Sequence, residues 1–174
     1  MTHRPRSLVF AGAIASTLVL GGCGDAAPGG SVVQVLRAPP LPEEAVLPEL
    51  VDYHPDLMVT ISEMKLHPSG VLWDDVSVGA GDSLDVDMTA VVHYTGWFPD
   101  GTEFDSSRGS NPFSFRVGAG EVIDAWDVGV VGMRLGGKRK LVVPPEMGYG
   151  SDGFSSIPGN VILVFEIELL EIRP

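Results

Sequence analysis

The sequence is poor in cysteine, basic residues and histidine, and each shortage narrows the functions it can have. Cys23 is the only cysteine, so no disulfide can form within one chain. Lys and Arg number 11 against 23 Asp and Glu, which gives a formal net charge of -12. Such a surface repels phosphate backbones, so we do not expect nucleic acid as a partner. The histidines, at positions 3, 54, 67 and 93, lack the spacing of a metal site, and we expect neither a metal nor a cofactor.

The first residues also lack an apolar run long enough to span a bilayer. Arg4 and Arg6 precede an apolar stretch over residues 8–20, whose length suits the core of a signal peptide. The stretch leads into an LGGC motif that ends at Cys23 and resembles a bacterial lipobox. Residues 1–22 are therefore predicted to be a lipoprotein signal peptide and Cys23 the lipidated first residue of the mature chain. An ordinary secreted protein with one unpaired thiol is the alternative.

Proline and glycine dominate the segment after Cys23. APGG, RAPPLP and LPEEAVLPEL occur between residues 24 and 56 with little hydrophobic periodicity, which is typical of an extended tether. We predict a lipidated Pro/Gly-rich tether over residues 23–56 and one folded domain over residues 57–174, a length that can bury a single core. The chain is expected to be an extracytoplasmic, membrane-anchored lipoprotein, on either an inner or an outer membrane.

Within the predicted domain the dominant hydrophobic period is two, which is the period of a β-strand. In residues 84–95 the even positions are apolar, which places Tyr94 on the core side. His93 then lies on the polar face, as a surface residue in preference to a catalytic one. The last strand, over residues 161–170, alternates in the same way and turns Phe165 toward the core. Shorter runs at residues 57–66, 71–78, 113–117 and 139–143 bring the predicted sheet to five or six strands.

One stretch has the three- and four-residue spacing of an amphipathic helix. Its apolar residues are Val122, Ile123, Trp126, Val130 and Met133, and Gly129 and Gly132 weaken and end it. A single short helix can cover the apolar face of an antiparallel sheet. The predicted fold class is therefore α+β.

Two short motifs suggest other functions but lack the surroundings that those functions need. Residues 148–153 spell GxGxxG, yet a dinucleotide site needs a helix directly after the glycines, and FSSIPGN follows instead. Ser106 and Ser107 stand outside a GxSxG setting and have no convincing histidine partner. Neither nucleotide binding nor nucleophilic catalysis is supported.

Four blocks in order along the chain are far more specific: VVHYTGWFPDGTEFDSS, GEVIDAWDVGVVGM, RKLVVPPEMGYG and IPGNVILVFEIELLEI. Together they closely resemble the FKBP-type peptidyl-prolyl cis-trans isomerases. GVLWDDVSVGAG, over residues 70–81, is similar to the segment that enters this domain in bacterial members. The resemblance covers residues 70–172. It implies a twisted antiparallel half-barrel wrapped around one short helix, with a shallow apolar pocket between the two.

The resemblance also implies which residues form that pocket. Trp126 would be its floor, and the walls would be Tyr94, Phe104, Phe113, Val122, Ile123, Tyr149, Ile157 and Phe165. The backbone N–H of Ile123 and the hydroxyl of Tyr149 would donate to peptide carbonyls. Asp105 would hold the Tyr94 hydroxyl or interact with the polarised carbonyl of the twisting bond. A carboxylate that only caps the turn before Ser106 is the alternative for Asp105.

The implied reaction is rotation about an X–Pro bond, in which no covalent bond is made or broken. The expected partners are proline-containing unfolded or flexible polypeptides and, by the same resemblance, macrolides such as rapamycin. The protein is expected to be a monomer, as small members of the family commonly are.

Two departures from the family pattern fall near the pocket. Asp124 and Ala125 stand where the family usually has a basic residue or proline and then glycine, and the loop over residues 150–158, which contains Phe154, is about one residue shorter than in compact members. These departures leave two other interpretations open. One is a proline-peptide binding module or holdase with weak turnover, and the other is a structural surface lipoprotein whose pocket is vestigial.

Overall fold

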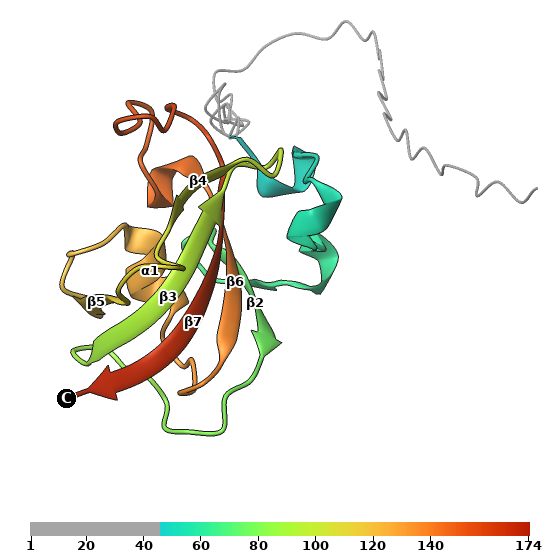
Figure 1. Ribbon diagram of the computed structural model, residues 1–174. Helices are drawn as coiled ribbons and strands as arrows, with labels where there is room; N and C mark the ends of the chain where they lie inside the picture. The colour runs from blue at the N-terminus through green and yellow to red at the C-terminus, as the bar shows by residue number, and fades with distance from the viewer. Residues whose placement is uncertain (1–45) are drawn as a thin grey trace, which may run out of the picture. The chain divides into compact units, whose positions relative to one another are not determined.

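The computed structural model describes residues 46–174, which form a twisted antiparallel sheet with one short α-helix (Figure 1). The strands are β1 Lys65–Leu66, β2 Leu72–Ser77, β3 Thr89–Trp97, β4 Glu103–Ser106, β5 Phe113–Arg116, β6 Lys138–Val143 and β7 Leu163–Arg173. They lie in the order β1-β2-β6-β7-β3-β4, and β5 pairs with the first half of β3. The α+β class and the antiparallel half-barrel are confirmed. The described sheet has seven strands and not five or six, because β4, with four residues, is too short to show a clear period and was not predicted.

The central strands β3 and β7 carry the alternation that the sequence predicts, within narrower bounds. Tyr94 and Phe165 both pack into the core on the inner face of the sheet, as expected. β3 begins only at Thr89, because Asp87 takes a left-handed backbone conformation with φ of 70° and places a turn before the strand. Val86, which the alternation assigned to the core, is consequently exposed.

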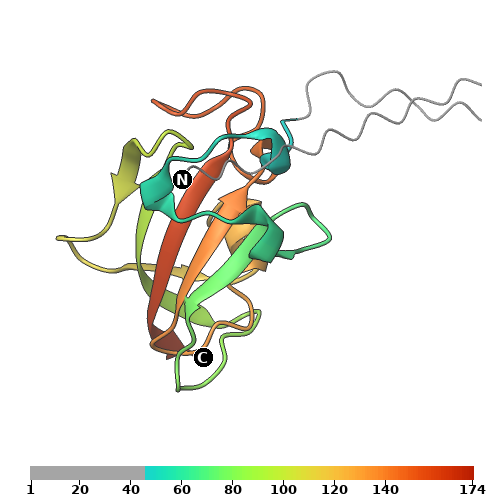
Figure 2. The same ribbon diagram turned by 90° about the vertical axis from the view of Figure 1, so that its right-hand side faces the viewer.

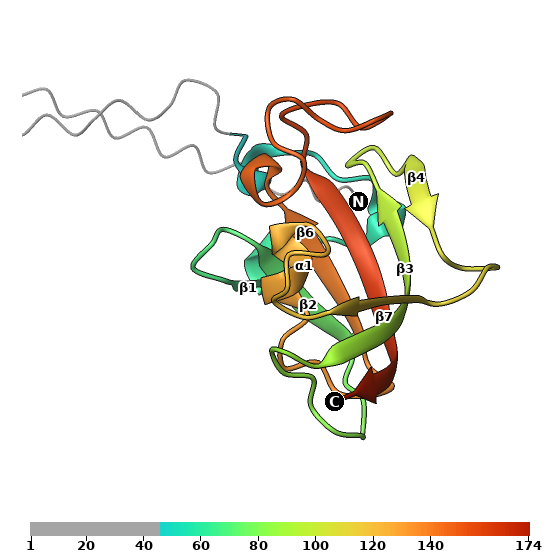
Figure 3. The same cartoon turned by 90° about the vertical axis from the view of Figure 1, so that its left-hand side faces the viewer.

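The helix α1, Asp124–Gly129, lies against the inner, concave face of the sheet (Figures 1 and 3). It is shorter than the predicted apolar stretch, although Val130 and Met133 beyond its end are still buried. Gly129 allows the helix to approach β6 closely, since a Cβ at this position would lie 2.9 Å from Leu141 Cδ1. Because the helix and the sheet lie so close together, Trp126 is buried between them in the core.

A second, smaller core lies on the outer face of the sheet. Leu57, Leu72, Val142, Ile162 and Val164 form it. Residues 46–64 cross this face as a strap with three 3-10 turns, η1 Pro48–Leu50, η2 Pro55–Leu57 and η3 Ile61–Glu63, followed by β1 (Figure 2). The run at residues 57–66, predicted as a strand, is thus mostly turns.

The strap also changes the expected end of the tether. Residues 46–56 were predicted to be extended, but Val51 and Tyr53 pack against the outer core. The Tyr53 hydroxyl donates to the Pro48 carbonyl at 3.0 Å, and the His54 N–H donates to the Pro99 carbonyl at 2.7 Å. Pro48 and Pro55 each start a 3-10 turn, since their fixed φ suits the first turn of a helix as well as an extended chain.

The predicted signal peptide, Cys23 and most of the predicted tether lie outside the described residues. Across residues 46–174, no helix has both the length and the apolar character needed to cross a membrane.

Candidate active site

An aromatic pocket of about 180 Å³ opens between α1 and the inner face of the sheet. Its lining comes from β3, β5, the segment before α1, α1 itself, the loop after β6, and β7. The lining residues are Tyr94, Phe113, Glu121, Val122, Ile123, Trp126, Tyr149 and Phe165. The fold thus brings together seven of the residues that the resemblance implied, from positions as far apart in sequence as Tyr94 and Phe165, and adds Glu121.

Trp126 forms the floor of this pocket and is 4% exposed. Other rings meet it edge-on: the ring centroid of Tyr94 lies at 4.9 Å, that of Phe165 at 5.4 Å and that of Phe113 at 6.2 Å. Such T-shaped contacts fix ring orientation as well as position. The indole Nε1 is buried and has no hydrogen-bond partner among the described residues. A buried unpaired donor costs about 1–3 kcal/mol, and such atoms are often found at binding sites.

Asp105 holds the hydroxyl of Tyr94. The hydroxyl donates to Asp105 Oδ2 at 2.6 Å, because β3 and β4 pair with Gly96 opposite Asp105. Burial, and then the hydrogen bond and charge of Asp105, raise the pKa of Tyr94 well above its ordinary value. Tyr94 therefore remains a neutral donor at any physiological pH. The turn after Asp105 is capped by another residue, since Ser106 Oγ accepts the N–H of Arg108 at 3.1 Å.

Ser107 has a histidine partner in the structure, although the sequence had indicated none. Ser107 Oγ lies 3.0 Å from His93 Nδ1 and also accepts the N–H of Tyr94 at 3.0 Å. Ser107 is only 5% exposed, so its oxygen is occupied and closed to a substrate. The contact anchors the junction of β3 and β4 beside Asp105 and does not form a nucleophile.

Two groups at the pocket are available as hydrogen-bond donors. Ile123 is the N-cap of α1, and its carbonyl accepts the N–H of Trp126 at 2.9 Å, while its own N–H donates to no described residue. The Tyr149 hydroxyl likewise bonds to no other described side chain or backbone group. Burial, and then the charge of Asp105, raise the pKa of Tyr149, which keeps the hydroxyl protonated.

Phe104 and Ile157 line an adjoining cavity of about 160 Å³ and not the main pocket. Tyr149 belongs to both cavities and separates them. Asp105 and Phe154 line the second cavity as well, and the ring of Phe154 stacks on that of Tyr149 with centroids 5.6 Å apart. The Phe104 ring still meets the pocket wall, because it contacts Phe165 edge-on at 5.6 Å.

The two residues of the first departure from the family pattern, Asp124 and Ala125, have different surroundings. Ala125 is completely buried in the core, so its methyl group does not reach the pocket rim. Asp124 is exposed at the first position of α1. Of the two, only Asp124 has a side chain open to solvent, and it directly follows the pocket residue Ile123.

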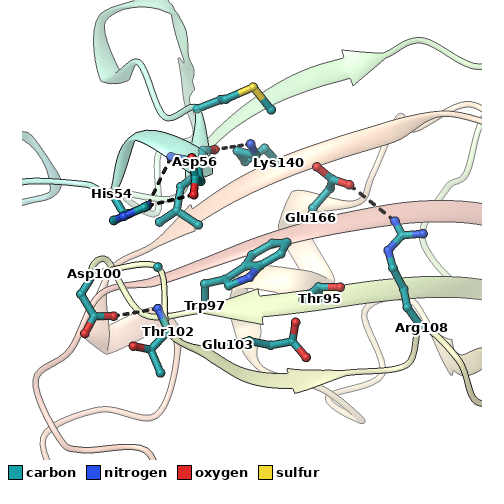
Figure 4. A pocket seen from close by; sticks show the side chains of 13 residues that line it. His54, Asp56, Thr95, Trp97, Asp100, Thr102, Glu103, Arg108, Lys140 and Glu166 are labelled. Atoms are coloured by element: carbon teal, nitrogen blue, oxygen red, sulfur yellow. Dashed lines mark hydrogen bonds and ion pairs between the residues drawn. The ribbon is translucent and has the colours of Figure 1, made fainter.

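A larger cavity of about 660 Å³ lies on the outer face of the sheet, between the strap and the turn after β3 (Figure 4). Its lining includes Trp97, Lys140 and Glu166 but none of the residues predicted for the site. Its cations already have partners: Lys140 donates to the Leu57 carbonyl, and Arg108 donates to Glu168 at 2.9 Å. Unlike this outer cavity, the inner pocket joins several apolar rings to donors that no described group satisfies. The inner pocket is therefore the candidate site. Within residues 46–174, no three His, Cys, Asp or Glu side chains are arranged to hold a metal ion.

Known proteins are similar to this chain in sequence and in fold. Residues 81–170 match the family model described as FKBP-type peptidyl-prolyl cis-trans isomerase. An FK506-binding protein of Neisseria meningitidis serogroup B is 45% identical over 105 residues, which cover 59% of this chain and 96% of that protein. FK506-binding protein 4 of Gibberella zeae is 44% identical over 104 residues, or 60% of this chain and 21% of that protein. The crystal structure of FkpA from Escherichia coli matches with a TM-score of 0.59 and 42% identity, over 64% of this chain and 52% of that one.

The chain therefore belongs to the FKBP-type peptidyl-prolyl cis-trans isomerase family. It spans about a fifth of the length of the fungal relatives that it matches and about half of the FkpA chain. With those proteins it shares one domain, whereas with the Neisseria protein it shares nearly the whole relative.

Proposed function

We propose that this protein is a peptidyl-prolyl cis-trans isomerase that accelerates rotation about X–Pro bonds in exported polypeptides. One observation carries the proposal: Tyr94, Phe113, Trp126 and Phe165 surround a single concavity. A pocket of this kind suits a proline ring, and its lining includes no serine, cysteine or lysine that could act as a nucleophile.

Such a pocket can lower the barrier to rotation without covalent chemistry. An X–Pro bond prefers trans by only about 0.5–1 kcal/mol, but its rotation crosses a barrier of about 18–20 kcal/mol because twisting removes the amide resonance. The planar amide is the more dipolar form and is well solvated in water, whereas the twisted form has less charge separation. Transfer of the bond into an apolar aromatic pocket therefore favours the twisted form. A pocket that fits the twisted proline better than either planar isomer adds differential binding of the transition state.

The polar groups of the pocket orient the peptide in this mechanism. The Ile123 N–H and the Tyr149 hydroxyl donate to peptide carbonyls on either side of the proline. Asp105 fixes the Tyr94 hydroxyl, and its charge faces the carbonyl carbon as the bond twists. Phe104 and Ile157 line the cavity that receives a residue beside the proline. A macrolide such as rapamycin competes for the same pocket, an inference that the names of the FK506-binding relatives support.

The predicted N-terminal segments give this isomerase a location. A signal peptide over residues 1–22 and a lipid on Cys23 would anchor the chain on the outer side of a membrane, with the tether ending near residue 46, where the strap begins. Mass spectrometry of the N-terminal peptide tests the anchor, since an acylated Cys23 adds the mass of its lipid and a Cys23→Ser variant does not. The isolated chain is expected to behave as a monomer in light scattering.

Refolding of a protein whose slow phase is limited by proline isomerisation tests the function. Uncatalysed, that phase takes tens of seconds. We expect the full chain to shorten it in proportion to its concentration, and Phe165→Ala to remove the effect. The matched control is Asp82→Asn, which lies in a separate cavity beside the C-terminal Pro174. A slow phase that stays constant at every concentration of the chain contradicts an isomerase.

The holdase interpretation predicts a different outcome of the same experiment. A holdase binds the unfolded protein and lowers the refolded yield or the aggregation without changing the rate of the slow phase. Ala125 no longer favours this interpretation, because its methyl group is buried in the core and leaves the pocket open.

A further inference from the structure

The charged side chains around the aromatic pocket are all acidic. Glu121 is the only charged residue that lines the pocket, and Asp105 is the only one that lines the adjoining cavity. Asp124 follows Ile123, whose N–H is the proposed peptide donor, and is exposed to solvent. A polypeptide that reaches the pocket thus passes carboxylates on both sides of it.

Basic side chains of the protein do not neutralise these three carboxylates. Glu121 Oε2 accepts the backbone N–H of Arg116 at 3.0 Å, but the Arg116 guanidinium turns away to Asp87, 3.4 Å from its carboxylate. Asp124 and Asp105 have no ion pair with any described residue. Among the residues that line the two cavities, none is lysine or arginine. The negative potential at the pocket mouth is therefore left for a ligand to neutralise.

We propose that the acidic rim formed by Asp105, Glu121 and Asp124 makes this protein selective for prolines that have a lysine or arginine beside them. The inference rests on the proposed isomerase function and names its substrate class. A long basic side chain suits the adjoining cavity, which has aromatic rings on its wall and a carboxylate beside them. Its methylenes can lie along the stacked rings of Tyr149 and Phe154, the latter 66% exposed, while its charge faces the carboxylates.

The expected size of the preference follows from the exposure of these groups. In water, a carboxylate about 7 Å from an ammonium group improves binding on the order of twofold to threefold. Two or three such carboxylates give a preference of roughly tenfold for lysine over glutamine at low salt, and glutamate is disfavoured by a similar factor. Screening acts over about 10 Å at 0.1 M salt and over about 3 Å at 1 M, so the preference must shrink steeply as salt is added.

The experiment compares three peptides that differ only in the residue before proline, which is lysine, glutamine or glutamate. The full chain is assayed for kcat/KM by NMR exchange, which needs no coupled protease, at low and at high salt. We expect the lysine-to-glutamate ratio to be on the order of a hundredfold at low salt and to fall toward unity at high salt. A second set with the basic residue after proline shows on which side of the pocket the rim acts, and a preference on either side supports the inference.

Variants of the rim separate local charge from net charge. Glu121→Gln and Asp124→Asn are each expected to lower the lysine-to-glutamate ratio by about fivefold to tenfold, since each carboxylate acts on both peptides, and the double variant is expected to remove most of the ratio. Because the ratio is taken within each variant, a change in the overall rate does not affect it. Asp82→Asn removes the same charge far from the pocket and should leave the ratio unchanged.

The outcomes are distinguishable from failure of the proposed function. If the full chain accelerates the glutamine peptide but treats lysine and glutamate alike at low salt in both sets, the inference is overturned and the isomerase stands. A ratio that persists in the double variant or in high salt also overturns it. If the chain accelerates none of the peptides, the proposed function itself fails and the inference fails with it.

Discussion

We predict that Gly96→Ala lowers both the stability of the domain and its activity, because the added methyl group overlaps the Phe165 ring in the pocket wall and the Phe104 ring packed against it. A Cβ on Gly96 would lie 2.6 Å from Phe104 Cζ and 2.9 Å from Phe165 Cε1. Carbon atoms in contact sit about 3.5–4.0 Å apart, so the rings must move by roughly 1 Å. Overpacking of this kind costs about 1–3 kcal/mol. Since Phe165 also contacts Trp126, its displacement changes the shape of the pocket above the floor.

The assay for this prediction is urea unfolding, followed at the tryptophan fluorescence and paired with the peptide exchange rate. Gly96→Ala should lower the free energy of unfolding by about 1–3 kcal/mol without changing the denaturant slope. Phe104→Leu removes the ring atoms nearest to the new methyl group, so Gly96→Ala/Phe104→Leu should be more stable than the sum of the single changes implies. Additive effects, or a Gly96→Ala variant with wild-type stability and rate, would refute this account of the wall.

Three further predictions concern Tyr94, Tyr53 and Arg139. Asp105→Asn should lower the pKa of Tyr94 partway toward its ordinary value, because the carboxylate leaves while the burial remains; a titration of the phenolate absorbance that matches wild type would count against the Asp105 hydrogen bond. Burial, and then the charge of Glu49, raise the pKa of Tyr53 from 10.0 to about 12, so the stability tied to its neutral hydroxyl is complete below pH 10 and is lost as the pH rises toward 12. Tyr53→Phe should therefore reduce the alkaline decline in the urea midpoint, and an identical decline would be the contrary result. Arg139 is 3% exposed, donates to Asp75 at 2.8 Å and to the Gly129 and Val131 carbonyls at 2.9 Å, and stacks on Trp73. Arg139→Lys cannot make all of these contacts and should cost about 3 kcal/mol in urea unfolding, whereas the exposed Arg173→Lys should be near neutral.

The sequence predicted best the two central strands, whose inner faces pack on α1. β3 and β7 alternate because their inner residues pack on α1, so Tyr94 and Phe165 could be assigned to the core from period alone. The pocket as a set could not be derived in that way. Its rings come from β3, β5, α1 and β7, and only the resemblance to a known family related those distant positions before the structure did.

The strap was missed because its prolines were taken as a sign of extended chain. A signal for it does exist at the start of β7, where Ile162, directly before the strand, and Val164 alternate in step with Glu166 and Glu168 further along. A solvent-exposed face does not need two such residues, and in the structure both are buried beneath the strap. Two apolar residues on the supposedly exposed face of a strand thus indicate a second covering layer.

Other features were missed because they depend on contacts between segments that are distant in sequence, which a short sequence pattern does not show. His93 and Ser107 are fourteen residues apart and meet only because β3 and β4 pair. Arg139 and Lys140 are both nearly buried although charge usually marks the surface, since each finds carbonyl acceptors from another segment. Glu121 was passed over as a pocket residue, yet its position two residues before Ile123 could have suggested it.

The rate of cis-trans exchange in an X–Pro peptide, measured by NMR with and without the full chain, tests the central claim most directly. The account predicts exchange that grows in proportion to the chain concentration, is blocked by rapamycin, and is lost in Phe165→Ala while the variant remains folded. Exchange that stays at the uncatalysed rate in the presence of the folded wild-type chain would contradict it.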